Sequence, residues 1–352
     1  MKYFVETEDV RKTLSTNKKI RIVKYIYDMS KLQYGDIILV RFPGDSLSDR
    51  VRESTNSEYS HAMLYVDDSS YIEASDRVVA RNLARLLFDD MSDTCVLRVK
   101  EEFLKPYTID AAIYYARDVV GNPYAAMDAL RLEAGRIDNH TSETQICTRL
   151  VAKAYAKSGL YLVDNIEMCT PQQIQDSRFV EVKRDYLREA SDFDKKFAAS
   201  YDVTNDMVNA IFRLFDMLKP FANGSLRTMR QLIDHVSCHY EDDEPITKLM
   251  KDSGYLDILI IEEEKNKYNY DREEFIRYYG DDAYVAACSA LETNRKGKYR
   301  YKQDCNELIR LFIANGMTSH FLLSLIALNK QIIEQYELRE RVCYEVMEVH
   351  RS

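Results

Sequence analysis

The stretch that decides the fold is SHAMLYVDDSSYIEAS, residues 60–75. Two short apolar runs flank the polar sequence DDSS, and this pattern is typical of two strands joined by a tight turn. We therefore predict a β-hairpin with strands at 60–66 and 70–74. Its otherwise apolar strands carry His61 and Glu73, twelve positions apart. That separation allows the two side chains to lie side by side on one face of the sheet.

Further elements are predicted on both sides of the hairpin. The apolar, β-branched run at 36–40 follows a Tyr-Gly turn signal and indicates a buried strand. Residues 43–58 are polar and contain Gly, Ser, Asp and Asn, so we expect a long loop there. Two further strands are expected at 94–99 and 179–182, and two helices at 109–120 and 146–158, each followed by a glycine that ends it.

The chain is predicted to divide into two domains. Its 352 residues exceed the usual size of one domain. After about residue 189 strand signals nearly vanish and apolar residues recur with helical spacing. We predict an α+β domain with an antiparallel sheet at 30–190, a helical lead-in at 1–29 and an all-α domain of unknown role at 191–352. A charge-rich stretch at 185–196 is the expected linker.

Composition excludes several classes of protein. The net charge is -9, which argues against nucleic acid as a partner. No apolar run is long enough for a membrane helix, and the first residues lack the apolar core of a signal peptide, so we expect a cytoplasmic protein. Secretion by a non-classical route stays open. The seven cysteines are odd in number and include no CxxC pair, so we expect reduced thiols and no zinc ribbon or thioredoxin motif.

One cysteine, Cys147, is predicted to begin a helix. Ser142 and Gln145 fit a capping box just before it. The partial positive charge of a helix N-terminus lowers the pKa of a thiol, and the free backbone N–H groups can hold an oxyanion. The alternative is a small core residue on an amphipathic helix, and for an isolated cysteine that interpretation would be preferred.

His61 and Glu73 would supply what a nucleophilic cysteine needs. An imidazole takes the thiol proton, and a carboxylate beside it fixes the tautomer and stabilises the charged form. The alternative is a buried, hydrogen-bonded histidine and an ordinary charge at a sheet edge. Each alternative taken singly is the more common case, but their coincidence on paired strands favours the functional interpretation.

Five segments follow one another along the chain: YGDIIL at 34–39, SHAMLY at 60–65, YIEA at 71–74, VGNPY at 120–124 and CTRLVAKAY at 147–155. In their motifs they resemble the NlpC-type papain-like cysteine hydrolases. His61 precedes Cys147 in the chain. This order resembles that of the circularly permuted branch, which contains the YiiX/YebB-like hydrolases and the lecithin retinol acyltransferase-like enzymes. The resemblance covers roughly residues 30–185.

The resemblance implies a permuted papain-like domain with Cys147 as nucleophile, His61 as base and Glu73 as the orienting residue. Acyltransferase-like members often carry histidine at the third position, so Glu73 favours the YiiX-like side. Tyr124 would line the site or donate to the oxyanion, and a core aromatic role is equally open. The implied activity is cleavage of an amide, ester or thioester bond through an acyl-enzyme.

Two alternatives remain at this point. The same fold serves lipid acyltransferases and phospholipases, so the substrate is either peptide-like or a lipid acyl group. A non-catalytic protein that binds a protein partner through its helical domain is the second alternative. No cofactor and no metal are expected. The segment with His235, Cys238 and His239 has spacing that would suit a metal on one helix face, although a solvated helix face is the more common case.

Overall fold

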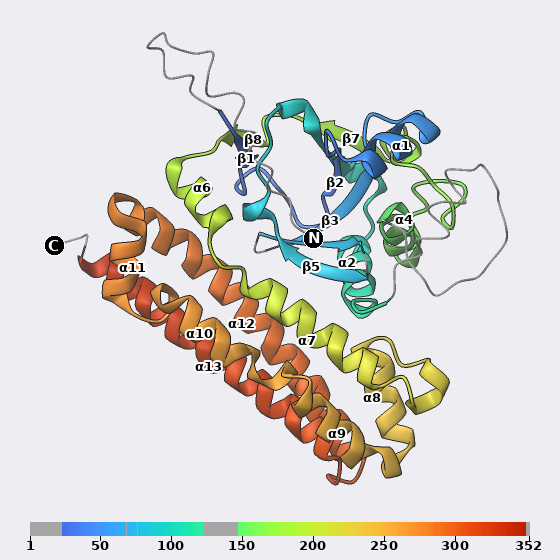
Figure 1. Cartoon of the computed structure of the whole chain (residues 1–352), viewed down its shortest axis with the longest axis vertical. Helices are drawn as coiled ribbons and strands as arrows, with labels where there is room; N and C mark the ends of the chain where they lie inside the picture. Colours follow the sequence, from blue (N-terminus) through green and yellow to red (C-terminus); the bar gives the residue numbers. More distant parts are fainter. Residues whose placement is uncertain (1–22, 68, 76, 123–146, 350–352) are drawn as a thin grey trace.

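The computed structural model describes residues 23–67, 69–75, 77–122 and 147–349. A sheet-containing half comes first, and a long layer of helices follows it along the chain (Figure 1). The predicted α+β class, with an antiparallel sheet followed by a helical half, is confirmed.

The central sheet has six strands in the order β5-β4-β3-β2-β6-β7, and every neighbouring pair is antiparallel. A separate two-stranded sheet pairs β1 with β8. The strands are β1 Tyr25–Tyr27, β2 Ile37–Val40, β3 His61–Asp67, β4 Ser70–Ala74, β5 Val78–Asn82, β6 Thr94–Val99, β7 Val180–Lys183 and β8 Leu187–Glu189.

The predicted hairpin is present as β3 and β4. Leu64 pairs with Ile72, and Tyr65 pairs with Tyr71. The same register places Glu73 opposite the residue two positions after His61. Since side chains on a strand alternate between faces, Glu73 and His61 share one face as diagonal neighbours.

Both faces of the central strand β2 are buried, which explains its continuous apolar run. Ile37 packs with the helices α2 (Thr108–Asp118) and α4 (Cys147–Lys157) on one face. Ile38 packs on the other face with Tyr27 of β1. The sheet therefore carries α4 on one face, and Cys147, the first residue of α4, lies near the first residues of β3.

A buried carboxylate fixes the turn that enters β2. Asp36 is 1% exposed and accepts from the backbone N–H of Gln33 at 2.8 Å. Arg98 of β6 donates to both of its carboxylate oxygens, at 2.7 Å each. This bidentate ion pair offsets the free energy needed to bury the Asp36 carboxylate, and it links the start of β2 to β6.

Some predictions for the first half are wrong. Residues 43–58 contain helix α1 (Ser46–Thr55), because Asp45 caps it by accepting from the N–H of Ser48. The polar composition that indicated a loop is that of a surface helix. The expected linker at 185–196 contains β8 and the start of α6 (Asp192–Ala199), which Ser191 caps.

The expected helical lead-in at 1–29 lies largely outside the described residues. Its described end is β-strand: Tyr25–Tyr27 pair with Leu187–Glu189 of β8. Aromatic and β-branched residues favour strands, and here the partner strand comes from the far end of the first half. The helical prediction is therefore wrong for these three residues.

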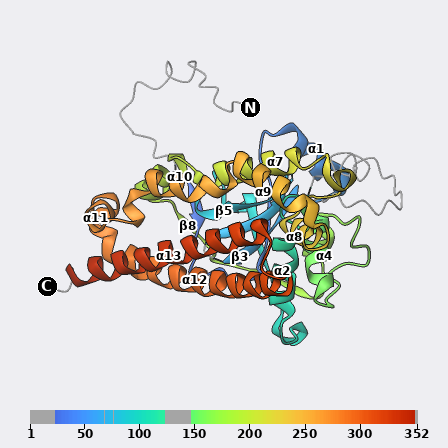
Figure 2. The same ribbon diagram turned by 90° about the horizontal axis from the view of Figure 1, so that it is seen from below.

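The second half is helical and ends in two long helices. α12 and α13 run alongside each other for most of their length (Figures 1 and 2). The remaining α-helices are α5 Pro171–Gln175, α7 Val203–Met217, α8 Met229–Cys238, α9 Asp243–Asp252, α10 Ile258–Lys265, α11 Arg272–Tyr279, α12 Ala283–Ala314 and α13 His320–Val349. Short 3-10 helices lie at Leu83–Arg85, Met91–Asp93, Glu101–Phe103, Phe221–Gly224, Tyr240–Asp242, Tyr255–Asp257, Lys267–Asn269 and Gly280–Asp282.

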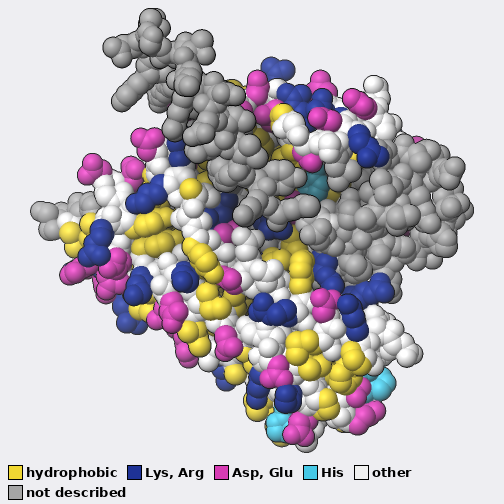
Figure 3. Space-filling model, viewed as in Figure 1, with side chains coloured by type: hydrophobic (Ala, Val, Ile, Leu, Met, Phe, Trp, Pro, Cys, Tyr) yellow, Lys and Arg dark blue, Asp and Glu magenta, His cyan; other side chains and the backbone are white. Residues whose placement is uncertain are grey.

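The two halves touch along the edge of the central sheet. Helix α7 lies against the edge strand β5, and α6 lies against the 3-10 helix Leu83–Arg85 (Figure 1). Acidic and basic side chains are interspersed over the visible face of the helical half (Figure 3). In the described part of the chain, no helix has the length and apolar character needed to cross a membrane.

Candidate active site

The structure brings His61 and Glu73 into direct contact. Atom Nε2 of His61 lies 2.8 Å from Oε2 of Glu73. Both side chains are largely buried, with exposed fractions of 16% and 10%. The predicted adjacency across the hairpin is therefore present, and the carboxylate occupies one of the two ring nitrogens.

Cys147 is the first residue of α4, and His61 is the first residue of β3. The thiol and the imidazole lie close enough to shift the pKa of each other, and the backbone N–H groups of Ala62 and Thr148 also lower the pKa of Cys147. Both side chains thus lie where an element begins. Helix α4 packs against β3, which keeps the two starting points together.

The ionisation of this pair differs from that of isolated side chains. Burial by itself raises the pKa of Cys147, but the charge and hydrogen bond of His61 overcome it and lower the pKa below the ordinary thiol value. Burial by itself lowers the pKa of His61, but Cys147 and Glu73 overcome it and raise the pKa well above the ordinary value. Both shifts act in the same sense, since each favours the charged form: the thiolate for Cys147 and the imidazolium for His61.

The first turn of α4 is tied to the segment that follows the helix. The Thr148 hydroxyl donates to the carbonyl oxygen of Cys169 at 2.6 Å. Arg149, only 2% exposed, donates through Nε to the carbonyl oxygen of Glu167 at 2.8 Å. These two bonds fix the orientation of the turn that presents Cys147.

Sequence reasoning missed Arg81, which completes the surroundings of Glu73. Its Nε donates to Oε1 of Glu73 at 2.7 Å, on the carboxylate oxygen that His61 does not contact. Burial by itself raises the pKa of Glu73, but His61 and Arg81 together lower it below the ordinary carboxyl value. The strand that carries Arg81 was not among the predicted elements, so nothing placed this arginine beside the hairpin.

Three residues of the predicted site lie outside the described residues. They are Tyr124, expected to line the site or donate to the oxyanion, and the capping pair Ser142 and Gln145. Their predicted roles stay predictions.

The other cysteines differ from Cys147 in surroundings. Cys95, Cys169, Cys305 and Cys343 are buried, while Cys238 and Cys288 are exposed. Burial raises the pKa of Cys95 to about 11 and that of Cys169 to about 12. A buried thiol with a raised pKa is unreactive at neutral pH, so these two are packing residues.

Hydrogen bonding and stacking engage the two histidines of the segment with His235, Cys238 and His239. His235 uses Nε2 to contact Asp242 at 2.7 Å, and its ring stacks on that of His239 with 4.2 Å between centroids. Among the residues that the structure describes, no three His, Cys, Asp or Glu side chains converge as metal ligands would. The structure thus gives no support to the metal hypothesis.

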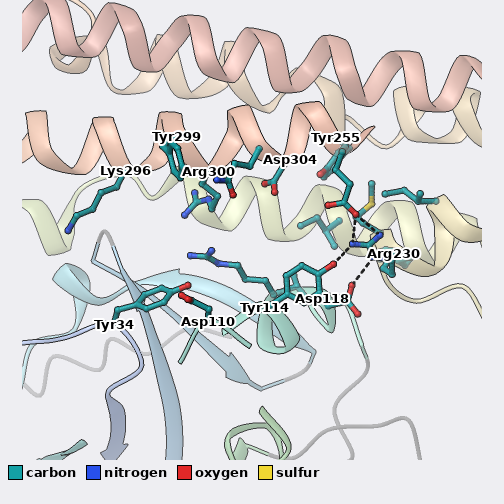
Figure 4. A pocket seen from close by; sticks show the side chains of 18 residues that line it. Tyr34, Asp110, Tyr114, Asp118, Arg230, Tyr255, Lys296, Tyr299, Arg300 and Asp304 are labelled. Atoms are coloured by element: carbon teal, nitrogen blue, oxygen red, sulfur yellow. Dashed lines mark hydrogen bonds and ion pairs between the residues drawn. The ribbon is translucent and has the colours of Figure 1, made fainter. Parts of the chain in front are cut away.

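A large cleft lies between the two halves, away from the thiol and imidazole. Its volume is about 900 Å³, and it is bordered by α2 on one side and α12 on the other. Figure 4 shows Tyr34 and Asp110 facing Arg300 and Asp304 across it. Of the described residues that line this cleft, none belongs to the set of Cys147, His61 and Glu73. Arg230 crosses one end and contacts Asp118 and Glu307.

Part of the chain is similar to known proteins. Residues 31–186 match the family model described as permuted papain-like amidase enzyme, YaeF/YiiX, C92 family. No curated protein matches the chain. A similar solved structure is described as the metalloprotein yiiX from Escherichia coli O157:H7. It is 20% identical, covers 44% of this chain and 97% of its own, and superposes with a TM-score of 0.34.

Proposed function

We propose that this chain, whose residues 31–186 match the family model of permuted papain-like amidases, is a cysteine hydrolase that cleaves an amide bond. The observation that carries the proposal is the opposed ionisation of two contacting groups. Burial by itself would raise the pKa of Cys147, yet that pKa is lowered by His61. The pKa of His61 is raised in turn. Glu73 lies 2.8 Å from the imidazole and stabilises its charge.

The reaction would proceed in two stages. The Cys147 thiolate attacks the carbonyl carbon, and the electron pair of the C=O bond moves to oxygen, where backbone N–H groups at the start of α4 stabilise it. The oxyanion collapses, and His61 gives its proton to the leaving amine. His61 then takes a proton from water, whose oxygen attacks the thioester, and the acid product leaves as the thiolate and imidazolium are restored.

The same acyl-enzyme would serve other substrates. The leaving groups of esters and thioesters need less help from a general acid than the amine of an amide does. The proposed site would therefore cleave ester and thioester bonds too. A lipid acyltransferase differs only in using a second acceptor in place of water. We favour an amide because the family match describes amidases. A protein partner for the helical half and a cytoplasmic location stay predictions from the sequence.

Acylation by p-nitrophenyl acetate tests the proposed nucleophile. We expect one acetyl group per chain, found by peptide mass mapping on Cys147, followed by slow release into water. The exposed Cys238 and Cys288 serve as internal controls, because accessibility by itself favours them. Acetylation of these two in preference to Cys147, or equal acetylation of Cys147 in His61→Ala, would show that Cys147 is not an activated nucleophile.

The bond type needs a matched pair of substrates. An anilide and a phenyl ester with the same acyl group differ only in the leaving group. We expect both to be cleaved, with the same acyl-enzyme mass and the same deacylation rate. Cleavage of the ester by itself, with the anilide bound as a competitive inhibitor, would assign the chain to ester or acyl-transfer chemistry.

A further inference from the structure

The Glu73 carboxylate has two cationic neighbours, one for each oxygen. His61 contacts Oε2 at 2.8 Å, and Arg81 contacts Oε1 at 2.7 Å. Arg81 pairs with Tyr71 in the register of β4 and β5, so it is a diagonal neighbour of Glu73, just as His61 is from β3. The three side chains therefore form a line across three adjacent strands.

The line continues into the helical half. Arg81 Nη1 donates to Oδ1 of Asn205, on α7, at 3.1 Å. The guanidinium is planar and always charged, so it can bond to a carboxylate and an amide oxygen at the same time without losing its proton. The bond to Asn205 thus fixes the part of the Arg81 guanidinium that does not contact Glu73.

We propose that Arg81 is a positioning residue of the active site, which holds the Glu73 carboxylate against His61 and is itself held by Asn205 of the helical half. The inference rests on the proposed function. In the proposed reaction His61 loses its proton to the leaving amine and later regains one. During that interval Arg81 is the remaining cation on Glu73, and it prevents the carboxyl group from taking up a proton.

Other ionisable groups near Glu73 do not replace Arg81. His61 faces it from β3, Arg81 from β5 and Tyr71 from its own strand. Burial, followed by the charge of Glu73, raises the pKa of Tyr71, so that hydroxyl stays neutral. Asp202, before α7, also faces Tyr71, and it pairs with Arg85 at 3.4 Å. Asp202 has the wrong sign to stabilise a carboxylate.

The chain offers a matched control for the link to α7. Arg77, just before β5, donates to Asp216 of α7 at 2.9 Å. It also donates to the carbonyl oxygen of Gly121 at 3.2 Å. The pairs Arg77–Asp216 and Arg81–Asn205 thus join the same edge of the sheet to the same helix. Of the two arginines, only Arg81 has a bond to Glu73.

The test is the rate of Cys147 acetylation by p-nitrophenyl acetate, measured against pH on the full chain. The acid limb is the part of the pH–rate profile where the rate falls because Glu73 takes up a proton. In Arg81→Gln this limb should move to higher pH by about one unit, because an adjacent cation lowers a carboxyl pKa by that much or more. At a given pH on that limb, the rate of the variant should be about tenfold lower than that of the wild type. Arg81→Lys, which keeps the charge, should give a limb closer to the wild type. Arg77→Gln should leave the limb unchanged.

The outcomes separate the two proposals. If the wild-type chain is not acetylated on Cys147 at any pH, the proposed function is wrong. If the wild type reacts and the limbs of Arg81→Gln and Arg77→Gln coincide, the function stands and the positioning role of Arg81 is wrong. A purely structural role for Arg81 would reduce the folded fraction, seen by circular dichroism, without moving the limb.

The contribution of the helical half is tested separately. Asn205 is exposed, so Asn205→Ala should fold even if Arg81→Gln does not. We expect its acid limb to move in the same direction as that of Arg81→Gln, by a smaller amount. Asp216→Asn removes the partner of Arg77 on the same helix and should leave the limb in place. Equal limbs for these two variants would overturn the link to Asn205.

Discussion

Cys147 and His61 depend on each other for their ionisation. Each is partly buried, and burial disfavours the charged form of both. The opposite charge of the partner reverses that effect in each case. A single substitution in the pair therefore does more than remove one group, because the remaining side chain returns to the neutral form that its burial favours.

Glu73→Gln tests the carboxylate at the same scale. Glu73 raises the pKa of His61, so its loss lowers that pKa, and the alkaline limb of the pH–rate profile should move to lower pH. On the acid side glutamine resembles the protonated carboxyl group, so the rate should stay at the low level that the wild type reaches only after Glu73 has taken up a proton. We expect at least a tenfold loss in the rate of Cys147 acetylation at neutral pH.

Glu181→Gln is the control for this change. Glu181 lies on β7, is exposed and pairs with Lys183. Its profile should match that of the wild type. Identical limbs for Glu73→Gln and the wild type would remove Glu73 from the proposed mechanism.

At the residue scale the sequence was informative where chemistry and position coincide. His61 and Glu73 stand out because they interrupt apolar strands, and Cys147 because it precedes an amphipathic helix. Arg81 has no such signal: an arginine near a strand end is common, and its importance depends on pairing with β4. The contacts that tie Thr148 and Arg149 to residues 167–169 likewise depend on the path of the chain after α4.

At the scale of elements, the turn before β2 depends on a glycine. Gly35 has a φ of +91°, and a Cβ there would lie 2.6 Å from Cγ2 of Ile109 on α2. Its carbonyl oxygen also accepts from the hydroxyl of Tyr155 on α4. Gly35 therefore lies at the point where the sheet meets both helices of its covered face.

Gly35→Ala should destabilise the chain by about 2–4 kcal/mol, the sum of left-handed strain and overpacking. Gly44 provides the control, since its φ is +81° and a Cβ there would have no neighbour within 4 Å. Gly44→Ala should cost only the strain, about 1–2 kcal/mol. Urea unfolding measures both, and equal midpoints would contradict the close approach of α2 to Gly35.

Element prediction from the sequence failed where local signals were ambiguous. Helix α1 has the polar composition of a loop, and its Asp45 cap is a short-range signal that also occurs in turns. Strand β1 is stabilised by β8, more than 150 positions away along the chain, which no local window includes. The hairpin and β2 were predicted correctly because their apolar patterns are strong and their turns short.

At the scale of the whole molecule, Arg85 links the sheet half to the helical half. It donates to the backbone carbonyl oxygens of Phe197 at 3.0 Å, Ser200 at 2.8 Å and Tyr201 at 2.8 Å. Its side chain is 13% exposed. These carbonyls lie at and just after the C-terminal end of α6, where the helix dipole is negative, so a cation is well placed there.

Arg85→Gln should destabilise the chain by about 2 kcal/mol, because hydrogen bonds from a charged group to backbone carbonyl oxygens of the helical half are lost. Arg178 is exposed and its guanidinium lies over the Phe179 ring, so Arg178→Gln should change stability by less than about 0.5 kcal/mol. Chemical denaturation compares the two. Equal stability would show that Arg85 does not join the halves.

The two-part organisation of the molecule was apparent from the change in periodicity along the chain. The contacts between the parts were not, because they join residues more than a hundred positions apart, such as Arg85 with Ser200. They are made by single polar side chains without a repeating pattern. The same reason hid the connection from Asn205 to the active site.

The most direct test of the central claim is the pH dependence of iodoacetamide alkylation at Cys147, followed by peptide mass mapping. We predict that Cys147 is alkylated faster than the exposed Cys238 and Cys288 at pH 6, because its pKa is lowered. In His61→Ala, burial raises that pKa, and alkylation of Cys147 should become slower than that of the two exposed thiols. Alkylation of Cys147 that is slower than theirs in the wild type, or unchanged in His61→Ala, would contradict the account.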